Sequence, residues 1–140
     1  MAERTATITG TEELQALIER VRNLPAFVDE CMPEAARQVK KELDQTVDSG
    51  SDPWGAQWEP KKQGHGTPLA HASGHVFVGA LGTRILIRLT GIETKHHRGW
   101  AKGGTKRVVI PTPDRELPGP LKTAIFKVII DSFTAYMTKP

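Results

Sequence analysis

The segment 121–137 constrains the fold more than any other part of the sequence, because it predicts a helix that is apolar around most of its circumference. At about 100° per residue, one face collects Leu121, Ala124, Ile125, Val128, Ile129, Phe133 and Tyr136. Phe126, Ile130 and Met137 widen this arc to well over half of the helix. A helix of this kind is buried on more than one side. In a chain of 140 residues, we expect the second side, with Phe126, Ile130 and Met137, to be an interface with another subunit.

Apolar residues at helical spacing predict two more helices in the N-terminal third, near residues 11–23 and 26–47. Pro25 can open the second helix, because the first helical residue needs no N–H donor. Pro33 can kink that helix. The single cysteine, Cys31, falls on the apolar side and is expected to be a small buried side chain.

The middle of the chain predicts a β-hairpin. Val76 and Val78 point one way in a strand and Phe77 points the other way. Over 83–90, Ile85, Ile87 and Leu89 alternate with Arg84, Leu86 and Arg88, which predicts a half-buried second strand with one solvated face. The letters GALG at 79–82 are typical of a turn.

The remaining segments read as connections within one domain, 1–140. We expect an N-terminal arm at 1–10, an extended loop with two tryptophans at 49–74, a basic loop at 94–107 and a short buried strand at 108–111. With the helices and the hairpin, this predicts an α+β fold: a long N-terminal helical segment and a C-terminal helix packed on a small, mainly antiparallel sheet.

Charge is distributed unevenly along the chain. Residues 1–48 carry ten acids and six bases, net −4, whereas residues 49–140 carry six acids and thirteen bases, net +7. Such a chain can bind an anion or stack on copies of itself. No stretch approaches the roughly 20 apolar residues of a membrane span, and the N-terminus lacks the apolar core of a signal peptide. We therefore expect a soluble protein and no membrane partner.

The sequence contains no recognisable catalytic constellation, so we expect no enzyme, no cofactor and no metal site. It has no P-loop, dinucleotide fingerprint or nucleophile elbow. His71 and His75 have the i, i+4 spacing of metal ligands on a helix, but Gly74 stands between them. A small metal-dependent nuclease using these two residues with His96 and His97 is a minor alternative.

The basic run 94–107 contains Lys95, Arg98, Lys102, Lys106 and Arg107 and no acid. One interpretation is a solvated loop whose charges only aid solubility. A second is contact with an acidic protein surface. A third, the main alternative function, is a nucleic-acid-binding module, in which these cations hold phosphates and Trp100 stacks on a base.

Several short motifs resemble those of the tailed-phage virion-morphogenesis proteins, the tail-completion and head–tail-joining family that includes the Mu G-like group. Gly55, Trp58 and Pro60 match its G-x-x-W-x-P element after the first long helix. The letters HHRG at 96–99 resemble its H-Q-x-G element, with His97 where glutamine is usual. The segment 107–111 resembles an arginine that leads into a strand and a proline-containing loop.

The resemblance implies an α+β fold and a structural role without enzymatic activity. It implies a homo-oligomeric ring, commonly of six subunits, at the neck of a virion or the head-proximal end of a tail. The implied partners are tail-tube and head–tail connector proteins, with DNA in the lumen as a further candidate. Assembly would take place in the host cytoplasm.

The resemblance also frames the question of the two tryptophans, Trp54 and Trp58. Large rigid rings on a loop can pack on a neighbouring subunit at low entropic cost, or they can fold back on the protein's own sheet. Because the family keeps a tryptophan at the place of Trp58, we expect Trp58 to pack within its own chain. We expect Trp54 to contact another subunit or a partner.

Overall fold

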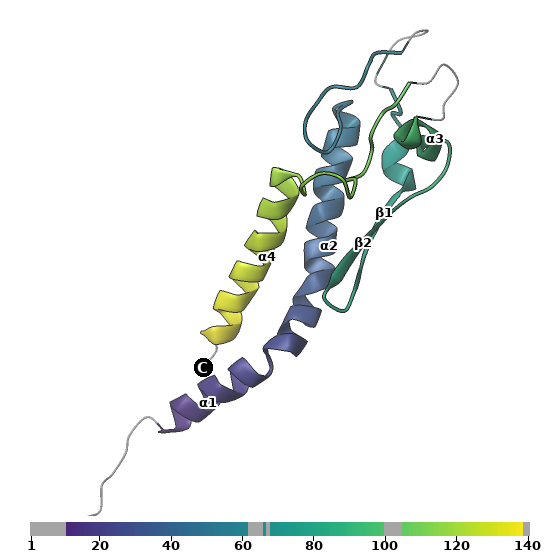
Figure 1. Cartoon of the computed structure of the whole chain (residues 1–140). Helices are drawn as coiled ribbons and strands as arrows, with labels where there is room; N and C mark the ends of the chain where they lie inside the picture. Colours follow the sequence, from purple (N-terminus) through teal and green to yellow (C-terminus); the bar gives the residue numbers. More distant parts are fainter. Residues whose placement is uncertain (1–10, 62–65, 67, 100–104, 139–140) are drawn as a thin grey trace, which may run out of the picture.

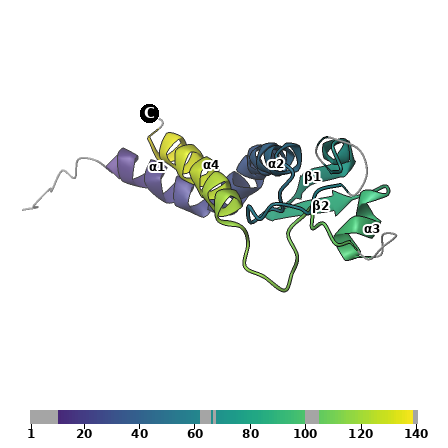
Figure 2. The same ribbon diagram turned by 90° about the horizontal axis from the view of Figure 1, so that it is seen from above.

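A central helix, α2 (Leu24–Asp48), organises the molecule. The C-terminal helix α4 (Gly119–Met137) runs along one side of α2, and the hairpin of β1 (Val76–Leu81) and β2 (Arg84–Leu89) lies along another side, as Figure 1 shows. Figure 2 shows the same order from above, with α2 between α4 and the hairpin. The expected α+β fold with its two long helices and small antiparallel sheet is confirmed, but α4 packs chiefly on α2 and not on the sheet.

The computed structural model describes residues 11–61, 66, 68–99 and 105–138. The arm predicted at 1–10 therefore lies outside the described residues, as does Lys102. Two shorter helices complete the description. The helix α1 (Thr11–Arg22) crosses the C-terminal end of α4, and α3 (Glu93–Arg98) follows the hairpin (Figure 1). No helix in the described part of the chain is long and apolar enough to cross a membrane.

The helix α2 forms as its sequence predicts. Pro25 lies in its first turn, and the helix continues through Pro33. One stripe of α2 is buried, with Phe27, Cys31, Met32, Ala35, Ala36, Val39, Leu43 and Val47. The burial expected for Cys31 is confirmed, and it raises the pKa of the Cys31 thiol.

The hairpin pairs antiparallel from Val76 opposite Leu89 to Leu81 opposite Arg84. The predicted alternation is confirmed, since Phe77 is exposed while Val76 is buried. The predicted turn at 79–82 is wrong, because Gly79 to Leu81 belong to β1. The chain turns instead through Gly82, whose φ of +58° is available to glycine at little cost.

The core consists of two clusters along α2. The first lies on its C-terminal half and joins Val39, Leu43, Val47, Trp58, Ala72, Val76, Val109 and Leu121. The second lies on its N-terminal half around Phe27, Cys31, Met32 and Ala35, and receives Val128, Ile129 and Tyr136 of α4. Both clusters contain side chains of the hairpin and of α4 packed on α2. The helix α2 therefore joins the sheet to α4.

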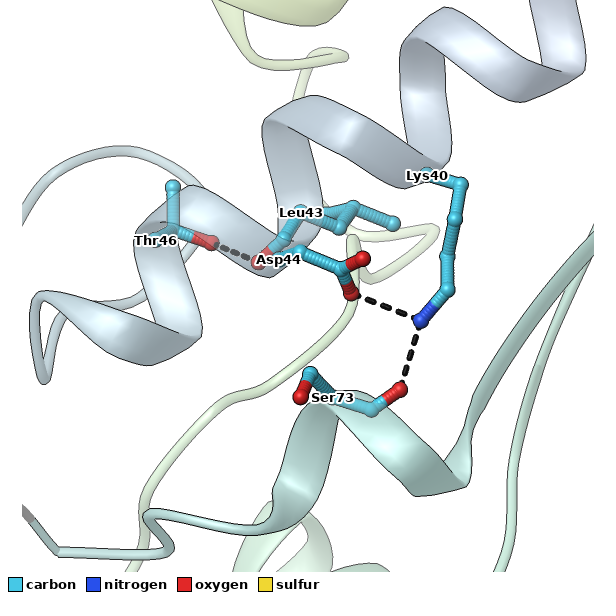
Figure 3. A network of polar contacts seen from close by, with 5 residues as sticks. All are labelled: Lys40, Leu43, Asp44, Thr46 and Ser73. Carbon is cyan, nitrogen blue, oxygen red and sulfur yellow. Dashed lines mark hydrogen bonds and ion pairs between the residues drawn. The ribbon is translucent and has the colours of Figure 1, made fainter.

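A polar contact ties α2 to the turn that leads into the hairpin. The turn is a short 3-10 helix, Ala72–His75. Lys40 Nζ donates to the Ser73 carbonyl (2.5 Å) and to Asp44 Oδ1 (2.6 Å), as Figure 3 shows. One ammonium thus satisfies a carbonyl of the turn while paired with a carboxylate one helical turn away.

Two connections differ from the prediction. The predicted basic loop at 94–107 begins as helix α3, which ends at Gly99 with a φ of +76°. The segment 108–111 is not a strand in the described structure. Val109 is nevertheless fully buried, so the segment is held by contacts other than a sheet.

Candidate functional site

The tryptophan loop is a closed turn after the end of α2. Ser51 and Gln57 form a β-bridge, and Trp58 N donates to the Gly50 carbonyl (2.8 Å). Inside the turn, Asp52 Oδ1 accepts from the backbone N–H groups of Trp54 and Ala56, each at 2.9 Å. An aspartate that bonds its own following backbone fixes such a turn. The sequence therefore builds a rigid loop here.

Trp58 packs within its own chain, as the family motif suggests, so its other candidate role as an interface residue is wrong. Its side chain is buried in the first core cluster. Its indole Nε1 donates to the Val108 carbonyl (2.9 Å). A buried tryptophan needs such a partner for its N–H. Trp58 therefore joins the tryptophan loop to the segment that contains Val109.

Arg107 connects the same loop to the same segment from the other side. Its Nε and Nη2 donate to the Glu59 carbonyl at 3.2 and 3.1 Å, and Nη2 also reaches the Pro60 carbonyl at 3.4 Å. Its Nη1 donates to His96 Nδ1 (3.3 Å), and its backbone N–H donates to the His96 carbonyl (2.9 Å). The side chain is only 7% exposed. Arg107 was predicted to be a surface contact residue; the structure makes it a buried connector instead.

The two histidines of α3 both act as acceptors through Nδ1. His96 accepts from Arg107, and His97 accepts from the buried backbone N–H of Val109 (3.1 Å). An imidazole that accepts through Nδ1 is neutral and carries its proton on Nε2. Burial lowers the pKa of both side chains, helped by the charge of Arg107 at His96 and by the charges of Lys106 and Arg98 at His97. Glu93 opposes the effect at His96.

We call Trp58, His96, His97, Arg107 and Val109 the clasp. It joins the tryptophan loop, α3 and the extended segment 107–110 by the contacts given above. Its members come from all three motifs that carry the family resemblance. The three motifs thus meet in space and hold the fold together.

Trp54 lies at the edge of the loop and is partly buried. Its Nε1 donates to the Glu116 carbonyl (2.9 Å), and the Arg115 guanidinium carbon lies 3.9 Å from the centre of its ring. These contacts are within the chain and link the tryptophan loop to the segment before α4. The contact of Trp54 with another subunit or a partner stays a prediction. It would use the part of the Trp54 ring that Arg115 and Glu116 leave exposed.

The basic residues separate into two groups. Arg107 is buried, whereas Lys95, Arg98 and Lys106 are exposed on and after α3. The effect of Arg98 and Lys106 on the pKa of His97 places their charges near that side chain. The structure therefore keeps a smaller basic surface than the sequence predicts.

The histidines of the minor nuclease alternative have separate roles. His75 Nδ1 lies 2.6 Å from Oε2 of Glu93, a nearly fully buried carboxylate. Glycine is required beside this pair, because a Cβ on Gly91 would lie 2.7 Å from Glu93 Oε2 and Gly91 has a φ of +80°. No local pattern in the sequence indicates the pair of His75 and Glu93. Among the described residues, no group of three or more histidine, cysteine or acidic side chains has the geometry to hold a metal ion.

The predicted interface residues on α4 are mostly uncovered. Phe126 is 61% exposed and Ile130 is 59% exposed, while Met137 is partly buried and its carbonyl accepts from Arg20 Nη1 (2.9 Å). Phe133 is also exposed on this side, although its ring meets Phe27 edge-on at 6.2 Å between centroids. Phe126, Ile130 and Phe133 form the α4 stripe. The exposed side chains agree with a second apolar side at Phe126 and Ile130, with Phe133 in place of Met137, and the interface with another subunit stays a prediction.

Comparisons with known proteins return no match: no family model, no curated protein and no solved structure is significantly similar to this chain.

The clasp predicts a large loss of stability when Arg107 is replaced by lysine. Lysine keeps the charge but cannot present the planar set of donors that reaches Glu59, Pro60 and His96 together. We expect Arg107→Lys to lower the free energy of unfolding by about 2 kcal/mol in urea titrations. The matched variant Arg84→Lys, on the exposed face of β2, should change it by less than about 0.5 kcal/mol. Equal effects of the two variants would contradict the role of Arg107.

The clasp also predicts a pH dependence. Because the folded-state pKa of His97 lies below its ordinary value of 6.5, the unfolded chain binds protons first as the pH falls. The corresponding stability is full above about pH 6.5 and is lost progressively below it. The free energy of unfolding should therefore be lower at about pH 5.5 than at about pH 7.5.

The variant His97→Asn separates this effect from general acid sensitivity. An asparagine Oδ1 can accept the Val109 N–H in place of Nδ1 but does not titrate. We expect a smaller difference in unfolding free energy between the two pH values for His97→Asn than for the unmodified protein. His71→Asn, at an exposed position, is the control. An unchanged difference in His97→Asn would show that His97 does not carry the effect.

Proposed function

We propose that this protein is a structural virion component that forms a ring at the head-proximal end of a phage tail, where it completes the tail or joins it to the head. The observation that carries the proposal is the α4 stripe. Its aromatic and aliphatic side chains are largely exposed although the same helix packs on α2 with its other face. Exposed apolar patches of this kind mark interaction sites.

The virion context of the proposal comes from the motif resemblance, and the α+β fold is the one that the resemblance implies. The arrangement of the motifs is also compatible with a structural role. The clasp uses its arginine and histidines to hold backbone groups, and its side chains are committed to contacts within the chain. Surfaces outside the clasp are then available for assembly and for contacts with tail-tube and connector proteins.

The proposal predicts that a charge on the α4 stripe blocks self-association but leaves the fold intact. Phe126→Asp and Ile130→Asp should each convert an assembly into folded monomers, because a carboxylate buried in an apolar contact is costly. The loss should exceed tenfold in the association constant. Light scattering after size exclusion gives the mass, and circular dichroism reports folding.

The matched control is Leu81→Asp, which places the same charge on an exposed leucine at the end of β1, away from α4. It should leave the mass unchanged. If Phe126→Asp and Ile130→Asp instead unfold the protein, the stripe belongs to the monomer core. If the unmodified protein is a monomer at all concentrations, the ring itself is wrong.

A nucleic-acid-binding module is the second candidate, and the exposed group Lys95, Arg98 and Lys106 favours it. These cations supply sequence-independent attraction to phosphates, which falls steeply with salt. Arg107 is not available for this role, because its guanidinium is buried in the clasp. The available charge is thus smaller than the sequence suggests.

Titration with duplex and single-stranded DNA at low salt and at about 150 mM salt tests this candidate. Under the ring proposal, binding should be weak and should be lost at the higher salt. Lys95→Ala with Lys106→Ala should reduce the binding seen at low salt without changing the oligomer. Tight binding that persists at about 150 mM salt would favour the nucleic-acid function instead.

A further inference from the structure

The helix α1 presents an apolar stripe that the rest of the chain does not cover. Leu14, Leu17, Ile18 and Val21 follow one another at helical spacing, and we call them the α1 stripe. Each is between 41% and 55% exposed, and α1 has no buried residue among those described. The helix is tied down at its C-terminal end, where Tyr136 Oη donates to the Arg20 carbonyl (3.0 Å). The stripe itself is left facing solvent.

The α1 stripe and the α4 stripe match in length. Leu14 to Val21 and Phe126 to Phe133 both span eight residues, and the seven steps between their ends cover roughly 10 Å along a helix axis. One stripe is aliphatic and the other is mainly aromatic, so side chains of one can fill the spaces between those of the other. The same chain therefore carries two helical surfaces of equal length that the monomer leaves largely uncovered, although Phe133 also meets Phe27.

Charges at the rims of the two stripes are complementary. At 100° per residue, Glu13 lies about 90° to one side of the α1 stripe, and Lys127 lies about 90° to the opposite side of the α4 stripe. When two helices face each other and run parallel, those two rims fall on the same side of the contact. Glu13 immediately precedes Leu14 and Lys127 immediately follows Phe126, so the two charges are also at similar heights. Parallel packing brings them together; antiparallel packing separates them.

We infer that α1 of one copy packs in parallel on the α4 stripe of a second copy. The seven side chains of the two stripes are each between 41% and 61% exposed, so the contact would remove apolar surface from water on both copies. Because the two surfaces differ, the contact is heterologous, and repeating it closes a ring when the rotation allows. This inference rests on the proposed ring and names the surfaces that join its subunits.

A mixing experiment tests the contact. Leu17→Asp damages the α1 stripe and Phe126→Asp damages the α4 stripe, so each variant alone should be a monomer by light scattering. In an equal mixture, the intact α4 stripe of the first can receive the intact α1 stripe of the second. The remaining two surfaces are both damaged, so assembly should stop at a dimer of twice 15.4 kDa.

Three outcomes overturn the inference. If Leu17→Asp assembles like the unmodified protein while Phe126→Asp does not, something other than α1 covers the α4 stripe, and the ring proposal survives. If each variant alone is still a dimer, each stripe pairs with its own kind, and if both are monomers that do not combine in the mixture, the two stripes do not meet each other; either result rules out the contact. If the unmodified protein never assembles, the ring proposal fails together with the inference.

A charge exchange gives a second measurement that does not depend on apolar contacts. Glu13→Lys and Lys127→Glu should each weaken assembly by about two- to fivefold, the range for an exposed ion pair. Both changes in one chain should restore it, because residue 13 of each copy then faces a residue 127 of opposite charge. Failure of the double variant to recover would overturn the parallel alignment. The exposed pair Glu12→Lys with Arg84→Glu, not predicted to meet, is the matched control.

Discussion

The guanidinium of Arg107 is the interaction on which the middle of this structure depends. It reaches the carbonyls of Glu59 and Pro60 and the imidazole of His96. These groups belong to segments that no helix or sheet ladder joins directly. Backbone carbonyls that leave water need a donor, and one planar group with five N–H donors can serve several of them at once. The buried charge is therefore what allows long connections to form a compact unit.

The clasp also explains where the free surfaces lie. Trp58 and Val109 complete the core over the C-terminal half of α2. The hairpin and α4 both reach the two halves of α2, because Ala80 and Ile85 pack in the second cluster and Leu121 and Ile125 pack in the first. Outside the clasp, both helical stripes remain exposed, as do Phe77, Leu81 and Leu86 of the hairpin and Ile92 before α3. The clasp uses the long connections and leaves the outer faces of α1 and α4 uncovered, so these faces are available to a partner.

The sequence predicts the elements better than the connections. Periodicity identifies α2, α4 and the hairpin because a single buried face determines each of them. The glycine at 79 led to the prediction of a turn, although glycine also occurs in strands. The apolar run at 108–111 led to the prediction of a strand that the structure does not contain there. The sequence also predicts Arg107 to be a surface charge. In the last two cases the deciding contacts are hydrogen bonds between distant residues, and local pattern carries no signal for them. The α1 stripe is visible in the sequence, but its exposure depends on the tertiary arrangement.

Amide hydrogen exchange at protein concentrations above and below dissociation of the assembly tests the division between clasp and assembly surfaces most directly. Exchange reports the opening of each segment separately. Dilution should accelerate exchange in peptides from α1 and α4, because their partner is lost. Peptides from the tryptophan loop and from 105–110 should keep the same protection, because the clasp is complete within one chain. Loss of protection in the clasp on dilution, with α1 and α4 unchanged, would contradict the division of the molecule described here.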